Sequence, residues 1–201
     1  MRSNLELMSR AWDAYRAQWL PAIGFSTLHG VAGSVAGGLA AGVGTLVLSG
    51  PLAFGFCRAM VLIHRGHQPG LETYFDGFKR FVPSMVAFLL GGLAVVVGFM
   101  LLVVPGVLLA LGLSQTFYIL QDHPEMGAEE AMRESWRLTW GQGNMGKVIG
   151  MGLLMVGVLL LGLLALGVGV IVAAPLASLM AAGLYEELRL SDGRGDAFWF
   201  T

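Results

Sequence analysis

Long apolar runs alternate with short charged stretches along this chain. The apolar runs cover 20–56, 81–121 and 145–184. All 12 Lys and Arg and all 13 Asp and Glu lie in four stretches, which are 1–19, 58–80, 122–147 and 186–196. A membrane-spanning helix needs about 20 apolar residues, and each run is longer than that. The pattern therefore predicts that each run folds into two membrane segments joined by a turn.

Proline marks the predicted turn within each run. The three turn signals are Ser49-Gly50-Pro51, Val104-Pro105-Gly106 and Ala173-Ala174-Pro175. Proline suits the first turn of a helix, where its missing N–H leaves no hydrogen bond unmade. Six membrane segments follow from this interpretation: 20–48, 51–65, 83–104, 106–121, 146–172 and 175–189. At 1.5 Å per residue, a second segment of about 16 residues reaches only about 24 Å, so it must thin the bilayer, extend beyond these boundaries or enter the bilayer without crossing it.

An amphipathic helix is predicted before each pair of membrane segments. Bulky aromatic residues recur on one face of these helices, at helical spacing, between charged residues. We expect them to be interfacial anchors: Trp12, Tyr15, Trp19, Phe75, Phe78, Trp136 and Trp140. Such a helix either fixes the position of the following segments as an elbow or remodels the membrane. Ser3 is the predicted N-cap of the first helix, and Asp122 with Pro124 is predicted to start the third.

The same order of elements occurs three times, which predicts an internal repeat. Trp12 precedes Pro51 by 39 residues, and Trp136 precedes Pro175 by the same number. The predicted fold is all-α: a polytopic membrane protein of three helical hairpins related by a pseudo-threefold axis along the membrane normal. The repeat units are roughly 3–66, 70–121 and 125–189. They lie in a single membrane domain, 1–190, with a flexible tail at 191–201.

Composition supports a membrane protein, and the distribution of charge along the chain predicts its orientation. Apolar residues make up 56% of the chain and charged residues 12%, whereas soluble domains carry about 25% charged residues. The mean hydropathy is +0.72. The predicted turns carry no charge, so the positive-inside rule places both termini in the cytoplasm. The net charge of −1 argues against a nucleic-acid partner.

Small residues recur every four positions on two predicted membrane helices. They are Gly30, Ser34, Gly38 and Gly42 on the first, and Gly146 and Gly150 on a later one. This spacing lets two helix backbones approach closely in a membrane. The stripe is predicted to pack helices of this chain together, and the alternative is a seam between two copies.

Arg58 is predicted to lie near the middle of a membrane segment, whereas the other cations lie at segment ends or outside the segments. A charge at bilayer depth costs about 2.5–3.5 kcal/mol on insertion scales, so it needs a partner or access to the surface. One interpretation is contact with a lipid phosphate or another anion. The other is a structural role, in which the guanidinium snorkels to the cytoplasmic surface or pairs with helix-end carbonyls or with an acidic residue such as Glu72 or Asp76.

Other polar motifs give weaker indications of chemistry. Residues 141–146 match GxGxxG, but a dinucleotide site needs a preceding strand, and a flexible break is the simpler interpretation. His29 is expected to hydrogen-bond a neighbouring helix, and His64 with His67 has too few companions for a metal site. Ser114, Gln115 and Thr116 either line a polar path or bond helices together. No catalytic residue, cofactor or metal site is predicted.

Four stretches of the chain carry a family resemblance. They are Ser49-Gly50-Pro51-Leu52-Ala53-Phe54-Gly55-Phe56, Tyr74-Phe75-Asp76-Gly77-Phe78, Val103-Val104-Pro105-Gly106-Val107 and Glu130-Ala131-Met132-Arg133-Glu134-Ser135-Trp136. The chain resembles a widespread, largely uncharacterised prokaryotic family of polytopic membrane proteins. That family is similar to the membrane domain fused to some glycerophosphoryl diester phosphodiesterases. These motifs imply the fold and no catalytic residues.

Two functions follow as expectations. The first is a non-enzymatic membrane scaffold or accessory subunit of a larger assembly, in contact with membrane lipid and with other membrane subunits or a second copy. The second is a small transporter, channel or lipid-handling protein with a pathway between the three hairpins, near Arg58 and Ser114–Thr116.

Overall fold

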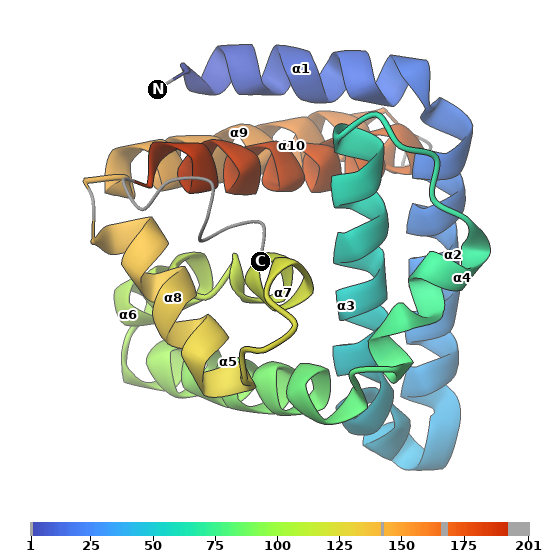
Figure 1. The fold of residues 1–201 in the computed structure, drawn as a ribbon, viewed down its shortest axis with the longest axis vertical. Coiled ribbons are helices and arrows are strands. Elements are labelled where there is room, and N and C mark those ends of the chain that lie inside the picture. The colour runs from blue at the N-terminus through green and yellow to red at the C-terminus, as the bar shows by residue number, and fades with distance from the viewer. Residues whose placement is uncertain (1, 142, 166–168, 193–201) are drawn as a thin grey trace.

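Helices and their connections make up the computed structural model, which describes residues 2–141, 143–165 and 169–192 and has no strand among them. The predicted all-α class is therefore confirmed. The helices, shown in Figure 1, are α1 (Asn4–Ala17), α2 (Trp19–Gly38), η1 (Leu39–Gly42), α3 (Val43–His64), α4 (Leu71–Phe75), η2 (Asp76–Phe78), α5 (Phe81–Leu101), α6 (Val103–Gly112), α7 (Thr116–Asp122), α8 (Ala128–Trp140), α9 (Met145–Leu164) and α10 (Val170–Ser191). Residues 193–201, which hold most of the expected tail, lie outside the described residues.

Five helical segments among the described residues are long and apolar enough to cross a membrane. They are α3, α5, the α6–α7 segment Val103–Asp122, α9 and α10. Helix α2, which covers most of the predicted segment 20–48, is not among these five, so five of the six predicted membrane segments correspond to a candidate span. The most apolar of them are the least buried: α5 has a mean hydropathy of 2.4 with 17% of its span buried, against 1.3 and 56% for α10. A protein that folds in water buries its most apolar surface. Helix α5 is more apolar than α10 and yet less buried, so its exposed surface is suited to contact with lipid.

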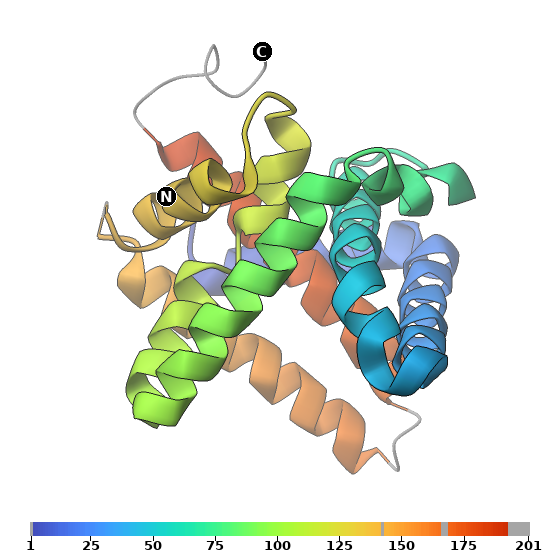
Figure 2. The same cartoon turned by 90° about the horizontal axis from the view of Figure 1, so that it is seen from below.

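Consecutive long helices pack against each other, and the shorter helices bridge them. Contacts join α2 to α3, α5 to α6, and α9 to α10. The amphipathic helix α1 lies on α10, α4 with η2 lies on α3, and α8 lies on α7. In Figure 2, the ends of α7 and α10 lie at the upper edge, and the turns that join α2 to α3 and α5 to α6 lie at the lower edge.

The core lies where α3, α7 and α10 meet. Helix α3 contacts both of the others, and the rings of Tyr118 on α7 and Tyr185 on α10 stack with centroids 5.4 Å apart. Around them, fully buried apolar side chains fill the space between the three helices: Met60, Ile63, Ile119, Leu120, Met180 and Leu188.

Two of the three predicted turn prolines are in fact inside helices. Pro51 lies within α3 and Pro175 within α10, so the predicted turns at these residues are wrong. The first turn is η1, where Gly42 has a φ of 96°, a conformation that glycine adopts without strain. Membrane helices tolerate internal proline because neighbouring helices and local adjustments satisfy the freed backbone groups. Pro105 fits the prediction, since it is in the first turn of α6.

The displaced turns also change the predicted segment lengths. Helices α3 and α10 each have 22 residues, because they begin before the predicted boundaries at 51 and 175. Of the three outcomes expected for a short second segment, extension beyond its boundaries is thus the one that these two helices show. The segment from Val103 to Asp122 is interrupted by a break between α6 and α7. It remains 20 residues long and apolar enough to cross.

The three predicted amphipathic helices differ in form. Ser3 caps α1 as expected, because its hydroxyl accepts from the Glu6 amide while the Glu6 carboxylate accepts from the Ser3 amide. The middle element is a short α4 followed by the 3₁₀ turn η2. The third, α8, begins at Ala128, so the predicted start near Asp122 is wrong.

Glycines allow the closest helix contacts, and these are mostly not the predicted ones. A Cβ on Gly55 would clash with the backbone of Tyr74, and a Cβ on Gly77 would clash with the backbone of Pro51. These two glycines let α4 and η2 lie directly on α3. A Cβ on Gly50 would likewise clash with the backbone of Ser84 on α5.

Candidate functional site

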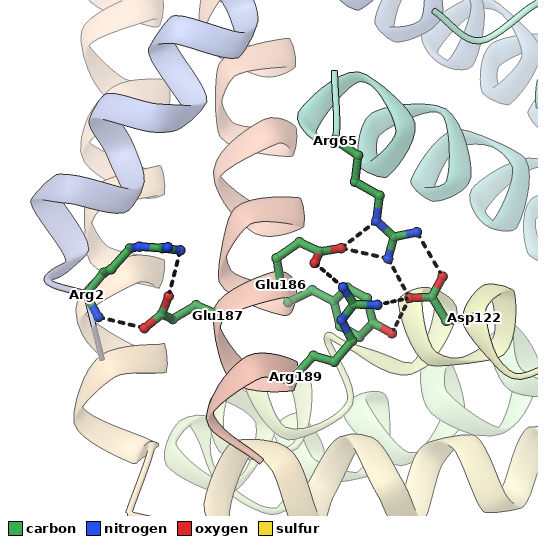
Figure 3. A network of polar contacts seen from close by, with 7 residues as sticks. Arg2, Arg65, Asp122, Glu186, Glu187 and Arg189 are labelled. Carbon is green, nitrogen blue, oxygen red and sulfur yellow. Dashed lines mark hydrogen bonds and ion pairs between the residues drawn. The ribbon is translucent and has the colours of Figure 1, made fainter. Parts of the chain in front are cut away.

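Charged side chains gather where α3, α7 and α10 end. We call Arg65, Asp122, Tyr185, Glu186 and Arg189 the central ion network (Figure 3). Arg65 is the C-cap residue of α3, Asp122 ends α7, and the other three lie in the last turns of α10. Residues more than 120 positions apart are thus joined at one end of the molecule, which we call the charged end.

Arg65 holds the other two helices. Its Nη1 and Nη2 donate to the two carboxylate oxygens of Asp122 at 3.2 and 2.6 Å, and its Nε donates to Glu186 Oε1 at 2.7 Å. This fork geometry fits a carboxylate and adds orientation to the Coulomb attraction. Burial opposes the charge, but the hydrogen bonds and charges of Asp122 and Glu186 outweigh it and raise the pKa of Arg65 above its usual range.

The remaining members complete a network in which opposite charges balance. Arg189 donates from Nη2 to Glu186 Oε2 at 2.6 Å, and its Nη1 lies 3.4 Å from Asp122 Oδ2. The Tyr185 hydroxyl donates to the same Asp122 oxygen at 2.9 Å. Two arginines therefore face two carboxylates. Such paired charges are suited to holding three helix ends together rather than to exchanging protons with a substrate.

Two smaller groups of ion pairs extend the charged end. Glu187 accepts from the Arg2 amide at 2.6 Å and from Lys147 Nζ at 3.1 Å, which joins the N-terminus and α9 to α10. Arg137 on α8 bonds Glu134 at 2.7 Å and Asp192 at 2.8 Å. Asp192, which we predicted to belong to a flexible tail, is instead 5% exposed and serves as the C-cap residue of α10.

Arg58 has the acidic partner that its position in an apolar segment predicts. Its Nε lies 3.2 Å from Asp76 Oδ2 on η2, and Lys79 Nζ lies 2.7 Å from the other oxygen of the same carboxylate. The side chain of Arg58 is 40% exposed. Asp76, one of the two candidates named from the sequence, is thus the partner, and Arg58 reaches past it to the surface.

His29 makes the structural contact expected of it. Its Nδ1 lies 3.1 Å from the Tyr74 hydroxyl on α4, and its ring stacks on Phe56 of α3 with centroids 4.5 Å apart. The ring of His64 packs at Gly183 of α10. Within the described ranges, no three His, Cys, Asp or Glu side chains are grouped closely enough to hold a metal ion.

The polar residues between α6 and α7 bond locally. Ser114 and Thr116 donate to carbonyl oxygens three residues back, at 2.7 and 2.8 Å. Ser135 of α8 accepts from the Gln115 amide at 3.1 Å and donates to the Gly112 carbonyl at 2.7 Å. Of the two interpretations of Ser114–Thr116, these bonds favour the one in which the residues bond helices together.

The glycine-rich stretch 141–146 connects α8 to α9, in agreement with a simple break. Gly143 has a φ of 72°, and neither neighbouring element is a strand. Asn144, which is buried, donates from its side chain to the Leu138 carbonyl at 2.8 Å. Gln142 lies outside the described residues.

Most of the predicted aromatic anchors are exposed on the surface of the protein. They are Trp12 (42%), Trp19 (55%), Phe75 (51%), Phe78 (40%) and Trp136 (42%). Trp140 is partly buried, and its ring lies 5.8 Å from that of Trp136. Tyr15 does not fit the prediction, because it is 7% exposed and packs in the core with Leu7 and Ala11. Helix α1 thus buries Leu7, Ala11 and Tyr15 and leaves Trp12 exposed.

The predicted small-residue stripe on α2 and η1 has no helix packed against it among the residues that the structure describes. A side chain placed on Gly30, Gly38 or Gly42 would meet nothing within 4 Å, and Ser34 bonds only back to Gly30 at 2.9 Å. Gly146 is equally open, and Gly150 faces the side chain of Asn4. The prediction that this stripe packs helices of one chain together is therefore wrong, because α3 contacts another face of α2.

Comparison with protein-family models, with curated proteins and with solved structures found no match to this chain.

Proposed function

We propose that this protein is a non-enzymatic scaffold or accessory subunit in a larger membrane assembly. The observation that carries the proposal is the open stripe of Gly30, Ser34 and Gly38 on α2. Small residues spaced by four are what a second membrane helix needs for close approach. The stripe is exposed, so its partner would be another subunit or a second copy of the chain.

The filled interior supports a scaffold rather than a pathway. The space between α3, α7 and α10 is occupied by fully buried side chains such as Met60, Ile119 and Leu188. At the charged end, Arg65 of α3 pairs with Asp122 of α7 and with Glu186 of α10. A route for a polar solute along this axis would have to displace these pairs.

The proposal includes a parallel threefold repeat and a cytoplasmic charged end. Each amphipathic element packs on the second membrane segment of the preceding unit. Helix α4 of the second unit packs on α3 of the first, and α8 of the third unit packs on α7 of the second. Helix α1 of the first unit packs on α10 of the third, which makes the order cyclic. This cyclic order is what three units in one orientation would give. Arg65, Lys147 and Arg189 lie at the charged end, and the positive-inside rule then favours an inner membrane with both termini in the cytoplasm.

The family resemblance belongs to the same proposal. The quoted motifs place Gly50 and Gly55 against α5 and α4, and Gly77 against Pro51. They act in helix packing, so a protein that shared them would share a framework. Such a framework supports a scaffold and carries no catalytic role with it.

The test is affinity capture of the tagged full-length protein in mild detergent. We expect the tagged protein to capture a stoichiometric membrane partner or a second copy of itself. Gly30→Leu and Gly38→Leu should abolish this capture, because a leucine side chain on the stripe keeps a second helix from approaching closely. Gly157→Leu on α9 is the matched control, since a side chain there also meets nothing within 4 Å. Loss of the partner in all three variants, or in none, would contradict the proposal.

The second candidate is a small transporter, channel or lipid-handling protein. Flux of a solute into proteoliposomes that contain the purified protein alone would favour it over the scaffold. An assembly that requires α2 and shows no flux would favour the scaffold.

A further inference from the structure

A small polar pocket lies beside Arg58, between α3, η2 and α7. Its volume is about 190 Å³, and we call it the Arg58 pocket. The residues that line it are Phe54, Arg58, Asp76, Lys79, Arg80, Gln121 and Pro124. A water molecule takes up about 30 Å³ of liquid, so the pocket has room for a phosphate-sized group with some of its hydration.

Positive charge exceeds negative charge in this pocket. Three cations line it, Arg58, Lys79 and Arg80, and Asp76 is the single carboxylate among the lining residues. Asp76 is shared, because Arg58 and Lys79 both pair with it, at 3.2 and 2.7 Å. The single negative charge of Asp76 is thus shared between the two positive charges of Arg58 and Lys79.

Arg80 adds a charge that backbone groups hold in place. It donates to the carbonyl oxygens of Leu120, His123 and Met126 at 2.7, 3.3 and 2.9 Å. Carbonyl oxygens orient the guanidinium without cancelling its charge. Burial lowers the pKa of Arg80, and the charge of Glu125 nearby offsets this only in part.

A buried donor without a partner also lines the pocket. Gln121 is 8% exposed, and its Nε2 makes no hydrogen bond to the described residues. A buried amide N–H that lacks an acceptor costs about 1–3 kcal/mol, so such groups usually face a ligand or water. Gln121 is a lining residue of the pocket, but its Nε2 is itself buried, so the side chain must turn for this donor to reach an acceptor in the pocket. The surrounding cations favour an acceptor that carries negative charge.

We propose that the Arg58 pocket binds a phosphate group, with Gln121 Nε2 as a hydrogen-bond donor and Arg58, Lys79 and Arg80 as the charge partners. The group can come from a phospholipid headgroup or from a free phosphate ion. The lipid is favoured by Phe75, the last residue of α4, and by Phe78 of η2, which lie one and two residues from Asp76 in the sequence and are 51% and 40% exposed. Acyl chains could lie along these rings. The proposal is independent of a partner at α2, so the capture experiment and the binding experiment can fail separately.

The test is the melting temperature of the purified full-length protein in a neutral detergent, titrated with three probes. The probes are short-chain phosphatidic acid, the diacylglycerol with the same chains, and inorganic phosphate. Binding to the folded state raises the melting temperature with ligand concentration, which yields an apparent Kd. We expect phosphatidic acid to bind most tightly, phosphate more weakly, and diacylglycerol not to stabilise the protein.

Two variants test the pocket and one serves as the control. Gln121→Met keeps the shape and removes the donor, so the apparent Kd should rise about tenfold. Lys79→Gln, at a side chain that is 78% exposed, should raise it about threefold and leave folding intact. Arg133→Gln removes one equally exposed cation on α8 and should leave the Kd unchanged.

Each outcome decides the proposal. Stabilisation by phosphatidic acid that weakens in Gln121→Met and Lys79→Gln supports a lipid headgroup, and the same result with inorganic phosphate alone supports a free anion. Equal stabilisation by diacylglycerol would overturn it, because the phosphate would then be irrelevant. Lack of stabilisation by both phosphate probes, or equal weakening in Arg133→Gln, would also overturn it.

Discussion

At the scale of single residues, ion pairs in this protein hold helix ends together. Arg65, Asp122 and Glu186 come from three helices and are 10–27% exposed at their side chains. Taking such groups out of water is costly, and the cost is met only when every partner is present. Removing one member therefore leaves the others buried without compensation.

Asp122→Ala is expected to lower the stability of the folded protein by about 3 kcal/mol, the order found when one partner of a buried ion pair is removed. Asp122 accepts from Arg65 and Tyr185 and lies beside Arg189, so one substitution disturbs contacts to two other helices. The measurement is the melting temperature in detergent. Glu129→Ala is the control, since its pair with Arg133 is exposed at both side chains and is worth about 0–1 kcal/mol. Equal melting of the two variants would show that the network does not hold the helices.

At the scale of helices, the apolar pattern predicted where helices lie but misplaced two turns. The preference of proline for a helix start reflects helices in water, and it misled us at Pro51 and Pro175. The signal that marked the first turn was the glycine-rich stretch around Gly42, which we had assigned to a packing stripe.

The candidate site was harder to predict from sequence than the helices. Arg65, Asp122 and Glu186 each stand at the end of an apolar segment, which indicates one membrane face. Nothing in their spacing shows that they meet, because that depends on how α3, α7 and α10 converge. The pairing of Arg58 with Asp76 could be predicted because the charge needed a partner and few were near in sequence.

Gly55→Ala is expected to destabilise the protein by about 1–3 kcal/mol, the usual cost of overfilling a tight contact. The added methyl would meet the backbone of Tyr74, and backbone cannot rotate away as a side chain can. Gly30→Ala is the matched control on an open helix face, where alanine should be neutral or stabilise by up to about 1 kcal/mol. Thermal melting of both variants in the same detergent gives the comparison. If the two substitutions have the same effect, α4 does not depend on close approach to α3.

At the scale of the whole molecule, apolar surface is distributed as lipid requires. The outer helices α5 and α9 have mean hydropathies of 2.4 and 2.3, and only 17% of each span is buried. Exposed aromatic residues such as Trp12, Phe75 and Trp136 lie on the shorter amphipathic elements. Their exposure is costly in water and favourable at the depth of lipid headgroups, where Trp is enriched. These features together give the molecule an apolar belt and a charged end.

The orientation of this belt gives the last prediction. The turn η1 between α2 and α3 carries no charge, whereas the connection from α3 to α4 follows Arg65 at the charged end. In a Cys57→Ala background, we expect Leu39→Cys to react with a membrane-impermeant maleimide added outside intact spheroplasts. Gln68→Cys, which is also exposed, should react only after the membrane is opened. The two positions control for each other, because the maleimide should label each cysteine only from the side of the membrane on which that cysteine lies. Labelling of Gln68→Cys from outside, with Leu39→Cys protected, would mean that the charged end faces away from the cytoplasm. The positive-inside argument would then fail for this chain.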